Sequence, residues 1–153
     1  METVTKSPKE TTDLGQKIAS SLVSNKNSAI ILALTGDLGS GKTTFVQGLA
    51  KGLGVKQRIL SPTFILMRKY NIKLSTINSQ LSTFYHIDLY RLEGAVESEL
   101  KNIGAPDIWG KKQNVVAIEW AEKVTGMFPG NTVWIKFENL GGNRRKIVIN
   151  DSP

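Results

Sequence analysis

The segment from residue 36 to residue 43 constrains this chain more than any other. It reads Gly-Asp-Leu-Gly-Ser-Gly-Lys-Thr and matches the P-loop pattern G-x-x-x-x-G-K-[ST], whose backbone N–H groups surround phosphate oxygens. Gly36, Gly39 and Gly41 carry no Cβ, so the backbone can take positive φ and close on a phosphate. The pattern therefore predicts a phosphate-binding loop between a strand and a helix.

Each side chain of this loop has an expected role at a triphosphate. Lys42 supplies a mobile cation for the β- and γ-phosphates, and the Thr43 hydroxyl is a hard oxygen ligand for Mg²⁺. The following helix points its N-terminus at the same negative charge. The residues that we expect to contact the nucleotide are Asp37, Leu38, Gly39, Ser40, Gly41, Lys42, Thr43 and Thr44.

The flanking sequence supports this interpretation. Ala29–Leu34 is a short apolar run with the length and composition of a buried strand. Residues 42–53 carry apolar side chains at helical spacing, and Gly54 offers a C-terminal stop. Strand, glycine-rich loop and helix in this order are typical of a P-loop, and a chance glycine-rich turn is the weaker alternative.

Composition places the chain among ordinary globular domains. Its 153 residues suit one domain, and 40% of them are hydrophobic. No apolar run approaches the ~20 residues that span a bilayer, and Met1–Lys6 lacks the apolar core of a signal peptide. Without cysteine the chain can form no disulfide or thiolate site. We therefore expect a cytoplasmic protein with no membrane contact.

The net charge of +7 has two interpretations. It could mark a nucleic-acid-binding surface. The densest basic groups are Lys111-Lys112 and Arg144-Arg145-Lys146, while other basic residues are spread along the chain. This spread favours a solubilising surface over a nucleic-acid footprint.

The remaining pattern predicts one α/β domain with a buried sheet that includes the P-loop strand. Residues 1–10 are expected to be loosely ordered, and the polar stretch 71–82 to be an exposed insertion or hairpin. We expect helices at residues 11–23, capped by Thr11-Thr12-Asp13, and at 93–100, ended by Gly104 and Pro106. Asn25–Ser28 is an expected loop. Further strands are expected at residues 63–67, 83–88, 115–118, 132–137 and 145–149, the last two forming a C-terminal β-hairpin.

Two carboxylates follow expected strands and could complete a phosphate site. Glu119 ends the apolar run Val115–Ile118, and Asp88 follows Tyr85-His86-Ile87. In parallel α/β sheets, ligands lie beyond the carboxyl ends of the strands. Either acid could therefore reach Mg²⁺, and the other could orient an attacking water.

Neighbouring residues leave their roles open. His86, the only histidine, is expected on the same side of its strand as Asp88. A half-buried position with a hydrogen bond is favoured over a catalytic role for it. Arg91 could contact phosphate or pair with a carboxylate. Thr63, in Ser61-Pro62-Thr63, could lie in a loop that senses the γ-phosphate, or in a simple turn.

Several segments together resemble the TsaE family, the bacterial P-loop ATPases of tRNA threonylcarbamoyladenosine (t6A) biosynthesis. The P-loop alone is common to many families, and the combination of His-x-Asp-x-Tyr-Arg with Ile-Glu-Trp is specific. The likeness runs from about Thr11 to Trp120 and is weaker in the C-terminal hairpin. The segments that carry it are Gly36–Phe45, Ser61–Phe64, His86–Leu92, Glu99–Gly104 and Ile118–Trp120.

The resemblance implies a mixed β-sheet flanked by helices and an ATPase that uses ATP and Mg²⁺. It implies two partners, the transferase subunit TsaD and its paralogue TsaB, with tRNA reached indirectly through the complex, and a slow hydrolysis that rises with the partners and resets the complex. It also implies roles for particular residues. Lys42 and Thr43 would serve phosphates and metal, Glu119 would be the Walker-B-type acid, and Asp88 the second catalytic acid. Thr63 would lie in the switch-like loop and Trp120 at the flank of the nucleotide.

Three other functions remain to be weighed. A GTPase should carry Asn-Lys-x-Asp after the P-loop, whereas the only Asn-Lys, at Asn25-Lys26, precedes it and lacks the aspartate. A small-molecule kinase would use the same loop with Asp88 as base, but we find no arginine-rich lid segment. A nucleotide sensor that binds ATP without hydrolysing it is the third alternative.

Overall fold

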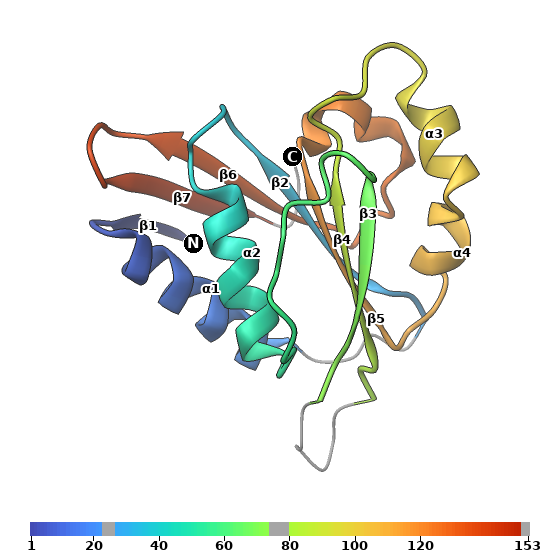
Figure 1. Cartoon of the computed structure of the whole chain (residues 1–153), viewed down its shortest axis with the longest axis horizontal. Coiled ribbons are helices and arrows are strands. Elements are labelled where there is room, and N and C mark those ends of the chain that lie inside the picture. Colours follow the sequence, from blue (N-terminus) through green and yellow to red (C-terminus); the bar gives the residue numbers. More distant parts are fainter. Residues whose placement is uncertain (23–26, 74–79, 151–153) are drawn as a thin grey trace.

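A seven-stranded mixed sheet forms the centre of the computed structural model, which describes residues 1–22, 27–73 and 80–150. Figure 1 shows this sheet between two layers of helices. The strand order is β1-β7-β6-β2-β5-β4-β3. The strands are β1 (Glu2–Thr5), β2 (Ile30–Thr35), β3 (Met67–Asn71), β4 (Thr83–Asp88), β5 (Asn114–Glu119), β6 (Val133–Asn139) and β7 (Arg145–Asn150).

The middle of the sheet is parallel and its edges are antiparallel. β2 pairs in parallel with β5 and β6, and β4 pairs in parallel with β5. β3 pairs with β4, and β7 with β6 and β1, in antiparallel fashion. β5 is buried along its whole length, as expected for a strand covered on both faces. The α/β fold class, the central P-loop strand and the C-terminal hairpin are thus confirmed.

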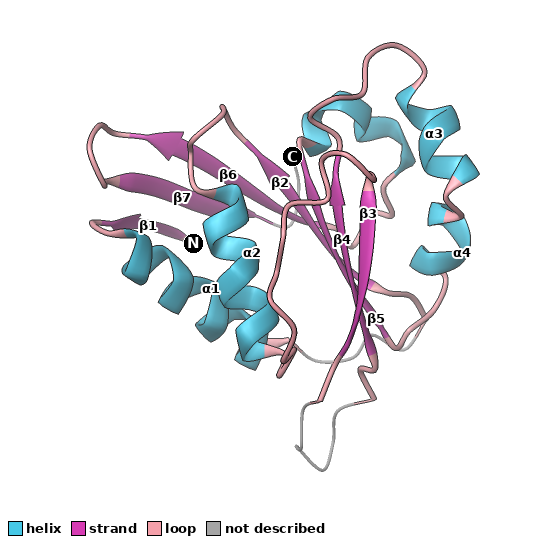
Figure 2. Cartoon of the chain, viewed as in Figure 1, coloured by secondary structure: helices cyan, strands magenta, loops and turns pink. Residues whose placement is uncertain are grey.

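The helices divide between the two faces of the sheet (Figure 2). α1 and α2 cover one face, where they pack on Leu32, Leu34 and Phe137. The other face packs Ile31, Val116 and the remaining helices. The helices are α1 (Pro8–Ser21), α2 (Lys42–Gly52), α3 (Val96–Asn102), α4 (Ala105–Trp109) and the 3-10 helix η1 (Ala121–Met127).

Glycines allow α1 and α2 to approach closely. A Cβ on Gly48 would lie 2.0 Å from the carbonyl oxygen of Thr12, and one on Gly15 would lie 2.3 Å from that of Phe45. These neighbours are backbone atoms that cannot rotate away. The two backbones are therefore in direct contact, which fixes the position of the helix that follows the P-loop.

The N-terminus differs from expectation. Residues 2–5 form β1 rather than a loose segment, because they pair with Arg145–Val148 of β7. Ser7, not Thr11–Asp13, caps α1. The Ser7 hydroxyl accepts from the Glu10 backbone N–H at 3.1 Å, and Glu10 Oε2 accepts from the Lys6 N–H at 2.8 Å. The arrangement resembles a capping box, except that the Glu10 carboxylate bonds the N–H of the residue before the cap, and proline lies in the first turn. Two N–H groups at the start of α1 are thus satisfied.

Two element boundaries were also wrong. The strand expected from Thr63 starts at Met67, because residues 63–66 form a turn and Leu66 has φ of 66°. The helix expected at 93–100 begins at Val96, because Gly94 has φ of 76° and cannot continue a helix. Gly104 does end α3, but Pro106 lies in the first turn of α4 rather than in a loop.

The polar stretch 71–82 belongs partly to a hairpin. β3 and β4 pair from Met67 opposite Ile87 to Asn71 opposite Thr83, and the Ile72 N–H donates to Ser82 O at 2.9 Å. Residues 74–79 of the expected insertion, and residues 25–26 of the expected loop, lie outside the described residues. In the part of the chain that is described, no helix has the length and apolar character needed to cross a bilayer.

Candidate nucleotide-phosphate site

The P-loop joins the carboxyl end of β2 to the start of α2. β2 is apolar and buried because helices cover both faces of the sheet, and strands flank it on both sides. Gly36 leaves it with φ of 130°, and a Cβ there would lie 2.3 Å from Phe137 O. Gly39 and Gly41 also have positive φ, of 75° and 101°. Glycine is thus required at these turns, and the loop closes over the first turn of α2.

Lys42 turns back into its own loop. Its Nζ donates to Gly36 O and, at 2.9 Å, to Asp37 O, and it lies 4.1 Å from the centroid of the Trp120 ring. Burial lowers the pKa of Lys42 below its ordinary value, although the charge of Glu119 opposes this shift. Nζ also donates to the Ser40 hydroxyl at 3.4 Å. A cation held by neutral carbonyl and hydroxyl groups and a ring face is well placed to exchange them for phosphate oxygens.

Thr43, Glu119 and His86 form a connected buried group. Thr43 Oγ1 lies 2.9 Å from both carboxylate oxygens of Glu119, and His86 Nε2 lies 2.8 Å from Glu119 Oε1. Glu119 and His86 are 2% and 0% exposed. His86 Nδ1 is buried without a hydrogen-bond partner, and Nε2 donates to Glu119 because a carboxylate only accepts. The expected hydrogen bond of His86 is present, but the side chain is fully rather than half buried.

Asp88 lies beside Glu119, because the two residues are paired in the parallel register of β4 and β5. Asp88 Oδ2 accepts from Thr63 Oγ1 at 2.7 Å and from Ser61 Oγ at 3.1 Å. Its Oδ1 accepts from the Tyr90 backbone N–H at 2.9 Å. The loop that follows α2 is therefore tied to the site through this one carboxylate.

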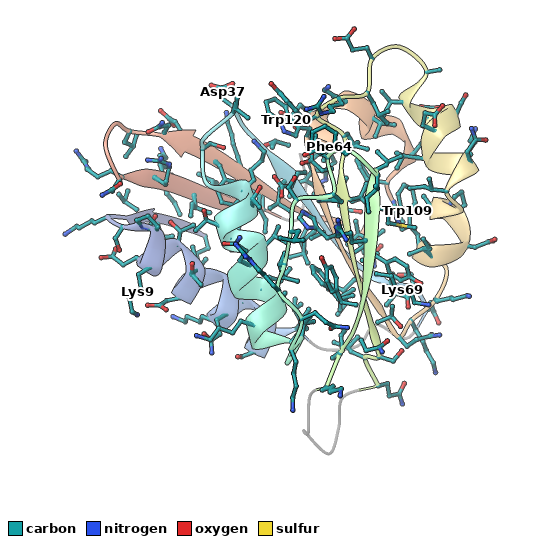
Figure 3. All side chains as sticks on the ribbon, in the orientation of Figure 1. Lys9, Asp37, Phe64, Lys69, Trp109 and Trp120 are labelled. Atoms are coloured by element: carbon teal, nitrogen blue, oxygen red, sulfur yellow. The ribbon has the colours of Figure 1, made fainter. Side chains whose placement is uncertain are left out.

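Trp120 covers the site from the end of β5. Its backbone has φ of 60°, which is unusual for a bulky residue, and it starts η1. Its ring lies 5.1 Å from the Tyr90 ring, centroid to centroid. Lys123 Nζ donates to the carbonyl oxygens of Tyr90 and Leu92, at 2.6 and 2.9 Å, which ties the two loops together. Figure 3 shows Trp120, Asp37 and Phe64 at the same end of the molecule.

A hollow of about 260 Å³ lies over these groups. The P-loop, Thr63, Asp88, Glu119 and Trp120 line it. It is also lined by residues that sequence reasoning missed, from the start of α1 and from the β6–β7 hairpin: Pro8, Thr11, Asn143 and Arg145. No spacing in the sequence marks them, because only the sheet order brings β1 and β7 beside the P-loop.

Two further side chains complete the picture. Glu122, which sequence reasoning also missed, accepts from the Gly36 N–H through Oε1 at 3.3 Å. Its position three residues after Glu119 was the only sequence feature that could have indicated that it lies near the P-loop. Arg91 neither lines the hollow nor forms an ion pair in the described part of the chain. Its guanidinium lies 4.0 Å from the centroid of the Phe64 ring.

The donor set suits Mg²⁺ bound together with phosphates. Thr43 and Glu119 offer only hard oxygen atoms, already within hydrogen-bonding distance of one another. The described residues contain no cluster of three or more acidic or histidine side chains that could hold a metal alone. Mg²⁺ usually takes one or two carboxylates and completes its shell with phosphate and water, so the residues present fit this ion.

Comparison with known proteins identifies the family. The sequence model described as "Threonylcarbamoyl adenosine biosynthesis protein TsaE" matches residues 5–147. The chain belongs to the TsaE family. The tRNA threonylcarbamoyladenosine biosynthesis protein TsaE of Treponema pallidum is 39% identical over 120 residues, covering 78% of this chain and 80% of the relative. The TsaE protein of Haemophilus influenzae is 36% identical over 125 residues, covering 81% and 73%.

A solved structure shares the fold. The crystal structure of YdiB from Bacillus subtilis superposes with a TM-score of 0.70 at 29% identity, covering 96% of this chain and 82% of that one. TsaE of the same organism is 34% identical over 119 residues, covering 78% of this chain and 68% of the relative. The TsaE family match extends beyond Trp120 through β6 into β7, so it includes the hairpin that lines the hollow.

Proposed function

We propose that this TsaE-family chain binds ATP with Mg²⁺ and hydrolyses it to ADP and phosphate in support of t6A formation on tRNA. The observation that carries the proposal is the convergence of four groups at one edge of the sheet. Lys42, the Thr43–Glu119 pair and Asp88 all line the same hollow. The family supplies the link to t6A biosynthesis.

Thr43 and Glu119 are the residues that would hold Mg²⁺, which when bound neutralises charge that develops on the phosphates. His86 keeps the Glu119 carboxylate turned toward Thr43, since it bonds one of the two oxygens from the side of β4. Lys42 exchanges its carbonyl partners for phosphate oxygens and stays oriented by the P-loop backbone.

Asp88 is then the residue that orients the attacking water. Its carboxylate lines the hollow, and it is bonded to Thr63 and Ser61 rather than to Thr43. The water oxygen bonds to the γ-phosphorus as the bond to the bridging oxygen breaks, and a water proton leaves through Asp88. Because Thr63 bonds Asp88, its loop would respond to the loss of the γ-phosphate, which makes it the switch-like loop.

The nucleoside would lie against the residues of α1 and of the β6–β7 hairpin. Pro8, Thr11, Asn143 and Arg145 line the same hollow as the acids. Arg145 can stack on a base or donate to the ribose. The absence of a guanine-reading Asn-Lys-x-Asp segment after the P-loop favours ATP over GTP.

TsaD and TsaB are the proposed partners, with tRNA modified in the cytoplasm by the complex and ATP hydrolysis resetting it between rounds. Large apolar side chains at this end of the molecule support docking of a protein there. Leu38, Phe64 and Ile65 are 69%, 82% and 55% exposed, and exposed large apolar side chains of this kind are available to a protein partner.

Two substitutions test the ATPase proposal. Lys42→Ala should abolish ATP turnover, and Glu119→Gln should lower Mg²⁺-dependent turnover more than ATP affinity, because the amide keeps the shape but not the metal ligand. Calorimetry gives the affinity and phosphate release gives the rate. Normal hydrolysis by Lys42→Ala would refute the site. Tight binding without any turnover by the wild type would favour the sensor, and phosphate transfer to an added small molecule would favour the kinase.

A further inference from the structure

The positive charge of this chain is concentrated in one segment. Residues 38–87 contain seven of the 20 Lys and Arg residues and none of the 13 Asp and Glu residues, so the other 13 basic residues balance all 13 acidic ones. The whole net charge of +7 therefore lies in this segment, which runs from the P-loop through α2 to β4. The basic residues themselves are dispersed along the chain, as expected, and this segment is positive because it lacks acidic residues.

Part of the segment forms a hollow on the outer side of α2. Its volume is about 310 Å³, and it is lined by Gln47, Lys51, Val55, Gln57, Arg58 and Ile59, a set called the basic groove below. Lys51, Arg58 and the intervening Lys56 are exposed. None of these three cations makes an ion pair within the described residues. The groove therefore offers cationic and amide N–H donors and no carboxylate.

The local backbone does not weaken this positive field. Carbonyl groups at the C-terminus of a helix carry partial negative charge. Here the Leu49, Ala50 and Lys51 carbonyl oxygens accept from the N–H groups of Leu53, Val55 and Gly54, at 2.9, 3.0 and 3.1 Å. The chain turn at Gly54 thus covers the end of α2.

The groove is separate from the phosphate site. Lys51 follows Lys42 by nine residues along α2, which at 1.5 Å per residue places their backbones about 14 Å apart. A ligand in the groove therefore leaves the nucleotide site free.

The layer on the other face of the sheet has no excess of positive charge. Residues 91–112, which include α3 and α4, carry four acidic and four basic residues. The sheet separates this layer from α2 (Figure 1). A polyanion that approaches the molecule is therefore attracted more strongly to the α2 side than to the α3–α4 side.

We propose that the basic groove binds the phosphodiester backbone of RNA, so that the chain contacts tRNA directly. The proposal rests on the proposed function, in which tRNA is the molecule modified. Lys51, Lys56 and Arg58 pair with phosphates, and Gln47 and Gln57 donate to phosphate or ribose oxygens. An acidic surface of a partner protein is the competing occupant, but Gln side chains beside the cations suit a backbone that offers acceptors at every step.

The test measures binding of an unmodified, fluorescently labelled tRNA transcript by anisotropy at several salt concentrations. Three phosphate contacts predict a slope of about −2.7 for log affinity against log salt, or roughly a 40-fold loss between 50 and 200 mM. The variant Lys51→Gln/Lys56→Gln/Arg58→Gln should bind at least about tenfold more weakly at low salt and lose most of that slope.

A charge-matched control separates the groove from net charge. Lys101→Gln/Lys111→Gln/Lys136→Gln removes three exposed charges outside the groove and should bind tRNA nearly as the wild type does. Equal losses in both variants would overturn the proposal, as would a wild-type slope shallower than about −1. Loss of TsaD–TsaB binding with tRNA binding intact would assign the groove to a protein partner instead.

Partner-free ATP turnover is measured for the same variants and should be unchanged, because neither triple touches the nucleotide site. Absence of tRNA binding with normal ATP turnover would overturn this inference alone. Absence of ATP turnover in the wild type would overturn the proposed function, whatever the result with tRNA. Should the groove triple variant fail to fold, the single variants Arg58→Gln and Lys51→Gln must each make the negative salt slope shallower than that of the wild type by about one unit.

Discussion

Gly48→Ala tests the close contact between α1 and α2. The new Cβ would lie 2.0, 2.7 and 2.9 Å from the oxygen, carbonyl carbon and Cα of Thr12. Real contacts of this kind are almost never under 3.0 Å, so the helices must separate by about 1 Å. Overpacking against backbone costs about 3 kcal/mol, and the better helix propensity of alanine offsets about 1 kcal/mol. The net loss is therefore about 2 kcal/mol.

For a domain of this size, that loss lowers Tm by about 4–8 °C, which scanning calorimetry resolves. ATP affinity should fall as well, because α2 carries Lys42 and Thr43 in its first turn. Gly110→Ala is the matched control, since its Cβ would meet nothing closer than 3.6 Å and its φ is −73°. A Gly48→Ala protein as stable as the control would refute the argument that the two backbones are in contact.

Three further substitutions test separate parts of the account. Ser7→Ala should lower the free energy of unfolding, measured by urea denaturation, by about 1 kcal/mol because it removes the cap of α1. An unchanged free energy would instead support a loosely ordered N-terminus. His86→Ala should lower the free energy of unfolding in the same assay by about 1.5–3 kcal/mol because buried Glu119 loses a charged hydrogen bond, and His86→Asn should have an intermediate effect. A His86→Ala protein as stable as the wild type would show that the bond is unimportant. Arg145→Ala should weaken ATP binding about tenfold in calorimetry but leave tripolyphosphate binding unchanged, and equal losses for both ligands would place the nucleoside elsewhere.

The sequence predicted the parts of the fold that depend on local pattern. The P-loop, the apolar strands at residues 30–35 and 114–119, and the C-terminal hairpin each carry a strong local signal. The placement of Asp88 beside Glu119 followed from the rule that parallel strands end at one edge. The family resemblance from the sequence motifs agreed with the later comparisons.

Other features depend on tertiary contacts that no local pattern records. β1 forms because β7 offers it an edge, and this pairing brings Thr11 and Arg145 to the same hollow. The start of β3 was misplaced because Leu66 adopts a left-handed conformation that sequence does not favour for leucine. Ser7-x-x-Glu10 is a local signal for a helix start, and the helix was nevertheless expected to begin at residue 11 rather than at Pro8.

The central claim is that the four converging groups hydrolyse ATP in support of t6A biosynthesis. The most direct measurement is the rate of phosphate release by this chain alone and with TsaD, TsaB and tRNA, for the wild type and for Lys42→Ala. The account predicts a slow wild-type rate that rises on adding the partners, and no rate above the partner background for Lys42→Ala. A wild-type rate that is unaffected by the partners, or a partner-stimulated rate that survives Lys42→Ala, would contradict it.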